Sequence, residues 1–262
     1  MNNVPELLIS GKTDVGRMRD HNEDNIAWDT SLGLALLADG MGGHNAGEVA
    51  SAIAVDVIRD SIVSSLQSLA GDEGEDDVGQ SREAAYGFSA VVHEAISSAN
   101  QAILEHAEGQ PQCAGMGTTI VMALFQGPFL TLAHVGDSRI YRLRDGELRQ
   151  MTTDHSLVQE LVENGFLTLE EARASANKNL ITRALGIDTV VEADVRSESY
   201  EAGDLFLLCS DGLSDLVPDE EIHTLLNVHV DDGQLDEAAD ALIDMANERG
   251  GADNISVILI RV

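Results

Sequence analysis

Positive charge is scarce in this sequence. Of 262 residues, 15 are Lys or Arg and 46 are Asp or Glu, so the formal net charge is −31. Lysine occurs only at Lys12 and Lys178. Nucleic acids and anionic membrane surfaces are bound through basic patches, so this composition argues against both as partners.

Cysteines and long apolar runs are scarce as well. Cys113 and Cys209 are too few for a disulfide framework, and Cys209 lies in an apolar run typical of a core position. No apolar stretch approaches the roughly 18 residues that a membrane-spanning helix needs. The N-terminal segment lacks the basic and apolar regions of a secretory signal. We therefore expect a cytoplasmic protein with no membrane insertion.

Strand-like apolar runs occupy much of the chain and come in adjacent pairs. Turn dipeptides such as Gly127-Pro128 and Asp145-Gly146 join them, which is typical of hairpins. Strands are expected at residues 7–16, 25–30, 32–38, 117–127, 129–136, 139–151, 204–210 and 254–262. Because paired strands differ from regular βαβ alternation, they predict an α+β fold in which helices cover antiparallel sheets.

Two long helical patterns flank an acidic segment, residues 70–81, which we expect to be a mobile loop. Apolar residues recur at helical spacing at Val49, Ile53, Val57, Ile62, Leu66 and Leu69, and again at Phe88, Val92, Ala95, Ala99 and Ile103. Shorter helices are expected at 156–164, 168–175, 219–226 and 235–249. Thr168 and Glu171 match a capping box, while Gly165 and Gly250 match helix stops.

Aspartate stands at the end of three apolar runs. LALLADG reaches Asp39, LTLAHVGDSR reaches Asp137 and LFLLCSDGLSD reaches Asp211. Asp253 instead precedes the last strand, and antiparallel neighbours of that strand would end beside it. One Asp-Gly turn is common without any function. Four strand-end carboxylates able to meet at one edge favour a shared site.

Clustered carboxylates repel one another and therefore favour a bound cation. Oxygen ligands suit Mg²⁺ or Mn²⁺, and the Gly40 carbonyl could supply one more oxygen. Two such ions ~3.5–4 Å apart can activate water for in-line phosphoryl displacement. Upstream, TDVGRMRDHNEDN adds Arg19, suited to gripping a phosphate, and Glu23, suited to holding metal-bound water. The competing interpretation of that segment is a polar surface loop.

Eight segments carry a family resemblance and together span residues 13–260: TDVGRMRDHNEDN, LLADGMGGHNAGEVAS, GMGTTIVMAL, HVGDSRIYRL, TTDHSLVQELVENG, LITRALG, LLCSDGLSDLV and GGADNISVILI. In this order they resemble the metal-dependent protein phosphatases, the PPM or type 2C family of Ser/Thr phosphatases, in its compact bacterial form. The resemblance implies an αββα sandwich, one catalytic domain over residues 1–262, and a flap at about residues 156–185.

The resemblance also implies two or three Mn²⁺ or Mg²⁺ ions. The expected ligands of the two-metal centre are Asp39, the Gly40 carbonyl, Asp211 and Asp253. The expected ligands of a third ion are Asp137, Asp211 and Asp215. Glu23 would anchor metal-bound water and Arg19 would bind the substrate phosphate. His44 is a candidate general acid, with a structural role as the alternative, and His155 is expected to have a local structural role.

The implied activity is hydrolysis of phosphoserine and phosphothreonine in proteins by a metal-activated water. Implied partners are phosphorylated proteins and a cognate Ser/Thr kinase, and a monomer is expected. Two alternatives remain: a non-catalytic, metal-dependent module that binds phosphoproteins, and a small-molecule phosphoesterase. A phosphate-binding P-loop lysine and a G-x-S-x-G nucleophile elbow are both missing from the sequence.

Overall fold

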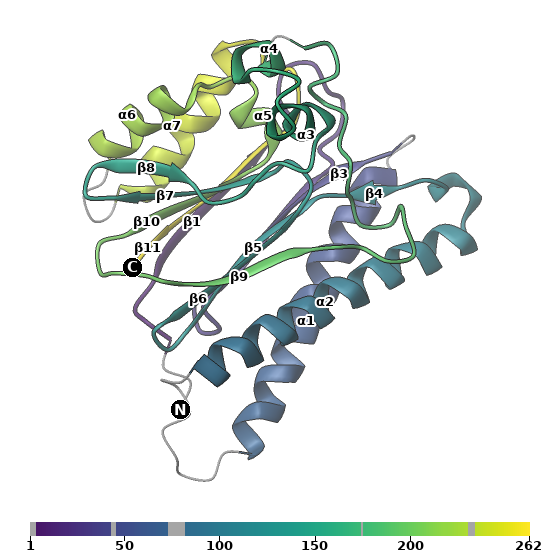
Figure 1. Ribbon diagram of the computed structural model, residues 1–262, viewed down its shortest axis with the longest axis vertical. Coiled ribbons are helices and arrows are strands. Elements are labelled where there is room, and N and C mark those ends of the chain that lie inside the picture. The colour runs from purple at the N-terminus through teal and green to yellow at the C-terminus, as the bar shows by residue number, and fades with distance from the viewer. Residues whose placement is uncertain (1–3, 43–45, 73–81, 174, 230–233) are drawn as a thin grey trace.

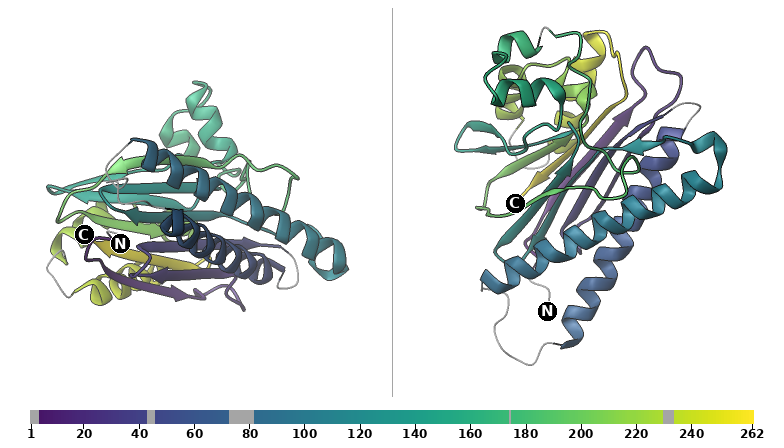
Figure 2. Two further views of the ribbon diagram at one scale, coloured as in Figure 1. Left: turned by 90° about the horizontal axis from the view of Figure 1, so that it is seen from below. Right: turned by 45° about the vertical axis from the view of Figure 1, so that its right-hand side comes forward.

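A computed structural model describes residues 4–42, 46–72, 82–173, 175–229 and 234–262. Within these ranges two β-sheets pack face to face, and helices cover the outer face of each sheet (Figures 1 and 2). Every strand pair is antiparallel. This confirms the α+β sandwich predicted from the sequence.

The first sheet has the strand order β1-β11-β10-β7-β8. Its strands are β1 (Leu8–Asp14), β7 (Arg139–Arg144), β8 (Glu147–Gln150), β10 (Leu205–Cys209) and β11 (Ile255–Arg261). The helices on its outer side are α5 (Asp211–Ser214), α6 (Asp219–Val228) and α7 (Leu235–Glu248). Leu207 and Val257 pack there against Ile222 and Leu242, and all four side chains are buried.

The second sheet has the order β2-β3-β5-β6-β9, with β4 paired to β3. Its strands are β2 (Asp24–Asp29), β3 (Leu34–Met41), β4 (Gly117–Thr118), β5 (Ile120–Gln126), β6 (Phe129–Val135) and β9 (Asp194–Ser199). Two long helices, α1 (Ala46–Asp72) and α2 (Arg82–Gly109), cover its outer face, and a short 3-10 turn at Pro111–Cys113 follows them.

A third apolar cluster fills the space between the two sheets. Phe125 from the second sheet meets Phe206 from the first edge to face, with ring centroids 5.7 Å apart. The central strands are thus buried on both faces, because helices cover one side and the opposite sheet covers the other. This explains why runs such as residues 34–38 and 205–209 are continuously apolar and do not alternate.

Two short helices, α3 (Leu157–Glu163) and α4 (Leu169–Arg173), lie beside the C-terminal helices at one end of the sandwich (Figure 1). Ser156 caps α3, since its hydroxyl accepts a hydrogen bond from the Gln159 amide. The predicted capping box is confirmed: the Thr168 amide donates to Glu171 Oε2 at 2.8 Å, and the Glu171 amide donates to Thr168 Oγ1. Gly165 has φ +74° after α3, as a helix stop requires.

One strand of the second sheet was not predicted from the sequence, whereas the apolar stripe of the first long helix was. β9 was not predicted, because DVRSES at the sheet edge is mostly exposed and polar. The predicted apolar stripe of α1 lies in the core: Ile62 and Leu66 are buried, and Val49, Ile53 and Val57 are partly buried against the same cluster. Ala46, Ala50 and Ala54 are buried as well, and their small side chains let the start of the helix lie close to the sheet.

Two further expectations concern chain segments. The run at 117–127 divides into β4 and β5. Residues 73–81 of the expected acidic loop lie outside the described residues, and residues 70–72 belong to α1. Among the described helices, none is both long enough and apolar enough to cross a membrane.

Candidate active site

Asp39 lies near the end of β3, where the strand leaves the apolar core. Its backbone is held by β4 and β5: the Asp39 amide donates to Thr119 Oγ1 at 3.1 Å, and its carbonyl accepts from the Thr119 amide at 2.9 Å. The next residue, Gly40, touches the start of α1. A Cβ at Gly40 would lie 2.2 Å from the Gly47 carbonyl oxygen, so the helix can approach only a glycine.

Glu23 and Asp24 reach the same place from the start of β2. Asp24 is the direct antiparallel partner of Asp39. The Glu23 amide donates to Asn254 Oδ1 at 2.8 Å, and the amide of Asn254 itself donates to Asp253 Oδ1. Asn254 Nδ2 donates further to the carbonyl oxygens of residues 15 and 21, so this one side chain shapes the loop that carries Arg19.

Asp211 and Asp253 arrive from the first sheet. Asp211 begins the short helix α5 directly after β10, and Asp253 stands just before β11, which pairs with β10. A Cβ at Gly212 would lie 2.0 Å from the Asn254 carbonyl oxygen, so glycine is required where these two segments meet. Arg19 Nη2 donates to Asp253 Oδ2 at 2.7 Å.

Asp137 follows β6 and lines a cavity together with residues of α3 and α4. Next to it, the hydroxyls of Ser138 and Thr119 are 2.8 Å apart, which links the Asp137 loop to the residue that holds Asp39. The Asp215 amide donates to the Asp211 carbonyl at 2.8 Å across the turn of α5, so both carboxylates lie at the same end of the first sheet.

These carboxylates shift one another's ionisation. The pKa of Asp39 is raised well above its ordinary value by burial and then by the nearby Asp24, Asp211, Asp137 and Asp253. Burial raises the pKa of Asp211 as well, with Asp137, Asp215 and Asp253 adding to the effect. The pKa of Asp137 rises to about 7, through burial first and then Asp154 and Asp215. The predicted convergence of strand-end aspartates is thus present.

The donor set fits divalent metal ions of the hard, oxygen-preferring kind. Asp24 Oδ1 is buried and has no hydrogen-bond partner, while Asp24 Oδ2 accepts from the Ser210 hydroxyl at 3.0 Å. Burial raises the pKa of Asp24 to about 6. One buried carboxylate with an unpaired oxygen, beside several partly buried ones, is an arrangement that Mg²⁺ or Mn²⁺ would neutralise.

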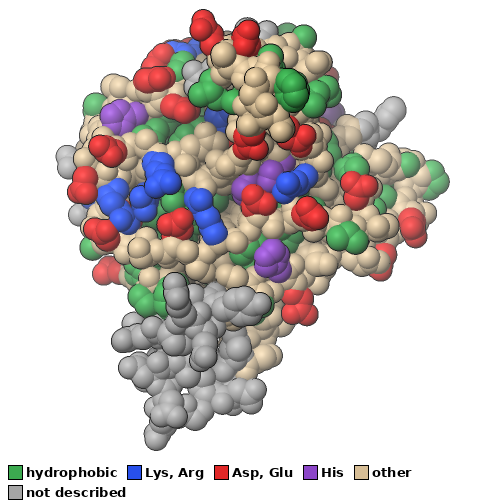
Figure 3. Space-filling view, in the orientation of Figure 1, with side chains coloured by type: hydrophobic (Ala, Val, Ile, Leu, Met, Phe, Trp, Pro, Cys, Tyr) green, Lys and Arg blue, Asp and Glu red, His purple; other side chains and the backbone are tan. Residues whose placement is uncertain are grey.

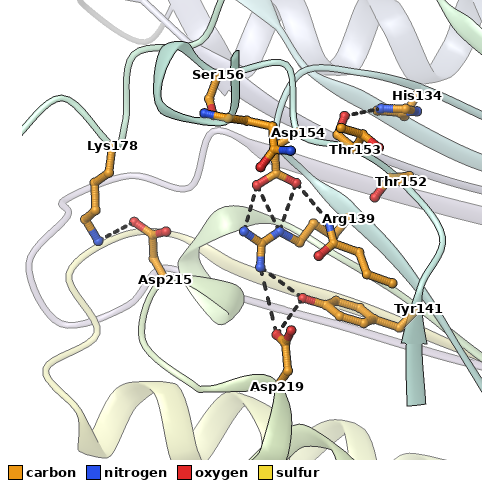
Figure 4. A network of polar contacts seen from close by, with 12 residues as sticks. His134, Arg139, Tyr141, Thr152, Thr153, Asp154, Ser156, Lys178, Asp215 and Asp219 are labelled. Carbon is orange, nitrogen blue, oxygen red and sulfur yellow. Dashed lines mark hydrogen bonds and ion pairs between the residues drawn. The ribbon is translucent and has the colours of Figure 1, made fainter. Parts of the chain in front are cut away.

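A cavity of about 260 Å³ lies between helices α3 and α4 and the end of the first sheet. Figure 4 shows its polar contacts: Arg139 Nη2 donates to Asp154 Oδ2 at 2.7 Å, and Lys178 Nζ contacts Asp215 Oδ2 at 2.7 Å. Asp137, Asp211 and Asp215 line this cavity together. The expected third-ion ligands therefore face the cavity beside α3 and α4.

A second cluster, formed by His134, His155 and Asp194, has ligand atoms within 4.8 Å of one another. Its hydrogen bonds oppose a metal. The Gly136 amide donates to His155 Nδ1 at 3.2 Å, so that nitrogen is already occupied. His155 Nε2 lies 3.3 Å from Arg183 Nη1, and this cation beside the ring disfavours a metal ion there. The cluster is better explained as a structural one, in which His155 fixes the backbone of Gly136. The Gly136 carbonyl also accepts a hydrogen bond from the His155 amide.

Most of the residues singled out in the sequence lie together. They are Arg19, Glu23, Asp39, Gly40, Asp137, Asp211, Asp215 and Asp253, whereas His44 lies outside the described residues. No role was predicted from the sequence for Asp24, Asn254 or Thr119. Asp24 directly follows Glu23 and Asn254 directly follows Asp253, so adjacency was a usable signal for both. Thr119 carried no comparable signal.

The family model for protein phosphatase 2C matches residues 17–257 of this chain. The chain belongs to the protein phosphatase 2C family. Among its relatives, this phosphatase is 38% identical to the serine/threonine phosphatase Stp of Listeria monocytogenes over 252 residues, which cover 95% of this chain and 93% of Stp. It is 40% identical to the serine/threonine protein phosphatase PstP of Mycobacterium tuberculosis over 256 residues, which cover 98% of this chain and 45% of PstP.

Solved structures agree with this assignment. The phosphatase superposes on a crystal structure of PstP from M. tuberculosis with a TM-score of 0.82 at 39% identity, covering 98% of both chains. A structure of the PstP catalytic domain in complex with two manganese ions gives a TM-score of 0.77 at 40% identity, covering 97% of both chains. The αββα architecture of the family is the one described above.

Proposed function

We propose that this phosphatase hydrolyses phosphoserine and phosphothreonine side chains of proteins with the help of bound divalent ions. The observation that carries the proposal is the meeting of Asp39, Asp211 and Asp253, from both sheets, beside Arg19. With the Gly40 carbonyl, these residues would hold two ions, Mn²⁺ or Mg²⁺. When bound, the ions supply a nucleophile at neutral pH and stabilise charge on the phosphoryl oxygens.

Arg19 would orient the phosphate group. Its guanidinium is exposed and lies on Asp253, and it can form a two-pronged contact with phosphate oxygens once that carboxylate is engaged by an ion. Glu23 would orient water, since its backbone is fixed by Asn254 and its carboxylate by the Gly47 amide. We keep His44 as a candidate proton donor for the leaving serine or threonine oxygen.

A third, weaker ion would be held by Asp137, Asp211 and Asp215. We propose that residues 1–262 act as one catalytic domain, in which residues 156–185 form a flap over this third site. The cavity between flap and sheet supports this proposal, because it is lined by all three carboxylates and by Lys178.

The partners would be phosphorylated proteins and the Ser/Thr kinase that modifies them. We propose a monomeric, cytoplasmic enzyme. The proposal excludes nucleic acid as a partner, in keeping with a net charge of −31.

The test is turnover of a phosphothreonine peptide with Mn²⁺, with and without EDTA. Wild type should release phosphate only with the metal, and Asp39→Asn should release almost none. Asp29→Asn is the matched control, since Asp29 ends the same strand pair at its opposite end and should not matter. Peptide binding without phosphate release would favour the non-catalytic alternative. Turnover of small phosphate esters but of no phosphopeptide would favour the small-molecule phosphoesterase.

A further inference from the structure

Two arginines stand directly opposite each other on the hairpin of the first sheet. Arg142 on β7 pairs with Arg149 on β8, so their side chains project from the same face. That face points toward the second sheet, because Arg142 also pairs with Phe206, a member of the core between the sheets. β8 is the outermost strand of the first sheet.

This pair carries two energetic costs. Like charges directly opposite on antiparallel strands repel each other. In addition, Arg142 Nε is buried and has no hydrogen-bond partner, and a buried donor without an acceptor loses its hydration without compensation. Among the described residues, neither guanidinium has a carboxylate oxygen within 4.0 Å. Nothing in the described chain offsets these costs.

The neighbouring cations are already engaged. Arg144, on the same face of β7, contacts Glu201 and Asp204, and Arg196 on β9 contacts Glu198 and the Met151 carbonyl. Figure 3 shows that blue side chains gather over the region of β7, β8 and β9, on a face where red ones are otherwise scattered. In a chain with 46 acidic and 15 basic residues, an arginine pair without carboxylate partners runs against the composition.

We propose that Arg142 and Arg149 form a docking surface for an acidic, extended segment of a partner protein. β8 ends the sheet, so among the described strands none pairs with its outer edge, and an extended segment can add there through backbone hydrogen bonds. Acidic side chains at alternate positions of that segment would reach the arginines. Carboxylate oxygens would then offset the repulsion and satisfy the unpaired donor.

Charge complementarity selects this occupant over nucleic acid. Binding of nucleic acid depends on neutralising many phosphates with Lys and Arg side chains, and a net charge of −31 opposes it. An acidic segment needs only a local contact, because repulsion from distant charges is screened beyond about 8 Å at physiological salt. The surface is independent of the proposed catalysis, so the two can be tested separately.

The test is fluorescence anisotropy of a labelled ten-residue peptide of alternating glutamate and threonine. Wild type should bind it, and the affinity should fall as salt is raised. The double variant Arg142→Gln, Arg149→Gln should bind about tenfold more weakly. The matched control is Arg59→Gln, Arg249→Gln, which removes the same charge from arginines that already have carboxylate partners. This control should bind as wild type does.

Three binding results would overturn the proposal. They are failure of wild type to bind the peptide, equal affinity in the double variant, and binding of inorganic phosphate at this surface without the peptide. Urea unfolding gives an independent readout. Because the arginine pair costs stability, the double variant should unfold at a higher urea concentration than wild type. A lower midpoint would show that the arginines serve the fold, and would also overturn the proposal.

Discussion

Lys178, in the segment after α4, contacts Asp215, which directly follows α5, with Nζ 2.7 Å from Oδ2. Asp215 is one of three carboxylates proposed to hold the third ion. The ammonium therefore takes the place beside Asp215 that a divalent ion would need. Lys178 and the proposed third ion would compete for the same carboxylate.

Replacing Lys178 by Met should strengthen binding of the third ion. The variant keeps the length of the side chain and removes the competing charge. We expect a weak-site dissociation constant for Mn²⁺ about two- to fivefold lower, the range of an exposed ion pair. Calorimetric titration after the tight sites are filled measures this.

The control for this variant is Lys12→Met. Lys12 is the other lysine of the chain and has an exposed ion pair with Asp240, 3.1 Å away, on α7. The variant Lys12→Met removes one positive charge far from Asp215, so the affinity of the weak site for Mn²⁺ should not change. If both variants behave alike, the competition at Asp215 does not exist.

Asp39→Asn should change activity and stability in different directions. Activity should fall by more than about 100-fold, since a direct ligand matters more than an outer partner does. In EDTA the variant should unfold at a higher temperature than wild type, because the raised pKa of Asp39 means that its charge disfavours the folded state at neutral pH. With Mn²⁺ the order should reverse. Thermal unfolding in both buffers decides, and a variant less stable in EDTA would contradict the prediction.

Arg19→Ala should act on substrate binding. Its guanidinium would contact the phosphate both before and during the reaction, so KM for a phosphopeptide should rise while kcat stays near wild type. Steady-state kinetics separates the two constants. A large loss of kcat at unchanged KM would instead give Arg19 a role specific to the transition state.

His155 should make the protein less stable in acid. Its pKa is lowered to about 4, first by burial and then by His134 and Arg183. The unfolded state thus binds the proton before the folded state does. Stability is complete above the ordinary histidine pKa of about 6.5 and falls as the pH drops toward 4.

The variant His155→Asn isolates this effect. Asparagine can still accept from the Gly136 amide but does not titrate, so the loss of stability between pH 6.5 and 4 should be smaller than in wild type. Urea unfolding in EDTA across that pH range measures the free energy of unfolding of both proteins. The contributions of the other titrating groups cancel in the difference between wild type and the variant. His155→Leu removes the acceptor and should be less stable at every pH. An identical pH profile for wild type and His155→Asn would refute the assignment.

The fold was largely readable because burial on both faces leaves continuous apolar runs. The residues between such runs were informative as well: Asp39 and Asp211 each end one, and Asp253 precedes one. β9 was not readable, since a mostly exposed edge strand needs no apolar pattern. Its pairing with β6 depends on tertiary contacts that no local sequence window contains.

Within the site, the carboxylates were easier to predict from the sequence than the residues that hold them in place. Clustered carboxylates repel one another, so these residue types indicate a bound cation without any structural information. Asn254 has no such signature, because its importance comes from bonds to residues 15, 21 and 23, more than 230 positions away in the chain. Likewise, Lys178 became significant only when folding brought it to Asp215.

The proposed metal ligands are divided between the two sheets. Asp39 lies on β3 of the second sheet, while Asp211 follows β10 and Asp253 precedes β11 in the first sheet. An ion bound among them would tie the two layers together as a cross-link does. Ligands that bind only the folded state also protect it from unfolding and proteolysis. Supply of divalent metal would therefore set how long each copy of the enzyme survives in a cell, and a shortage would reduce its abundance as well as its turnover.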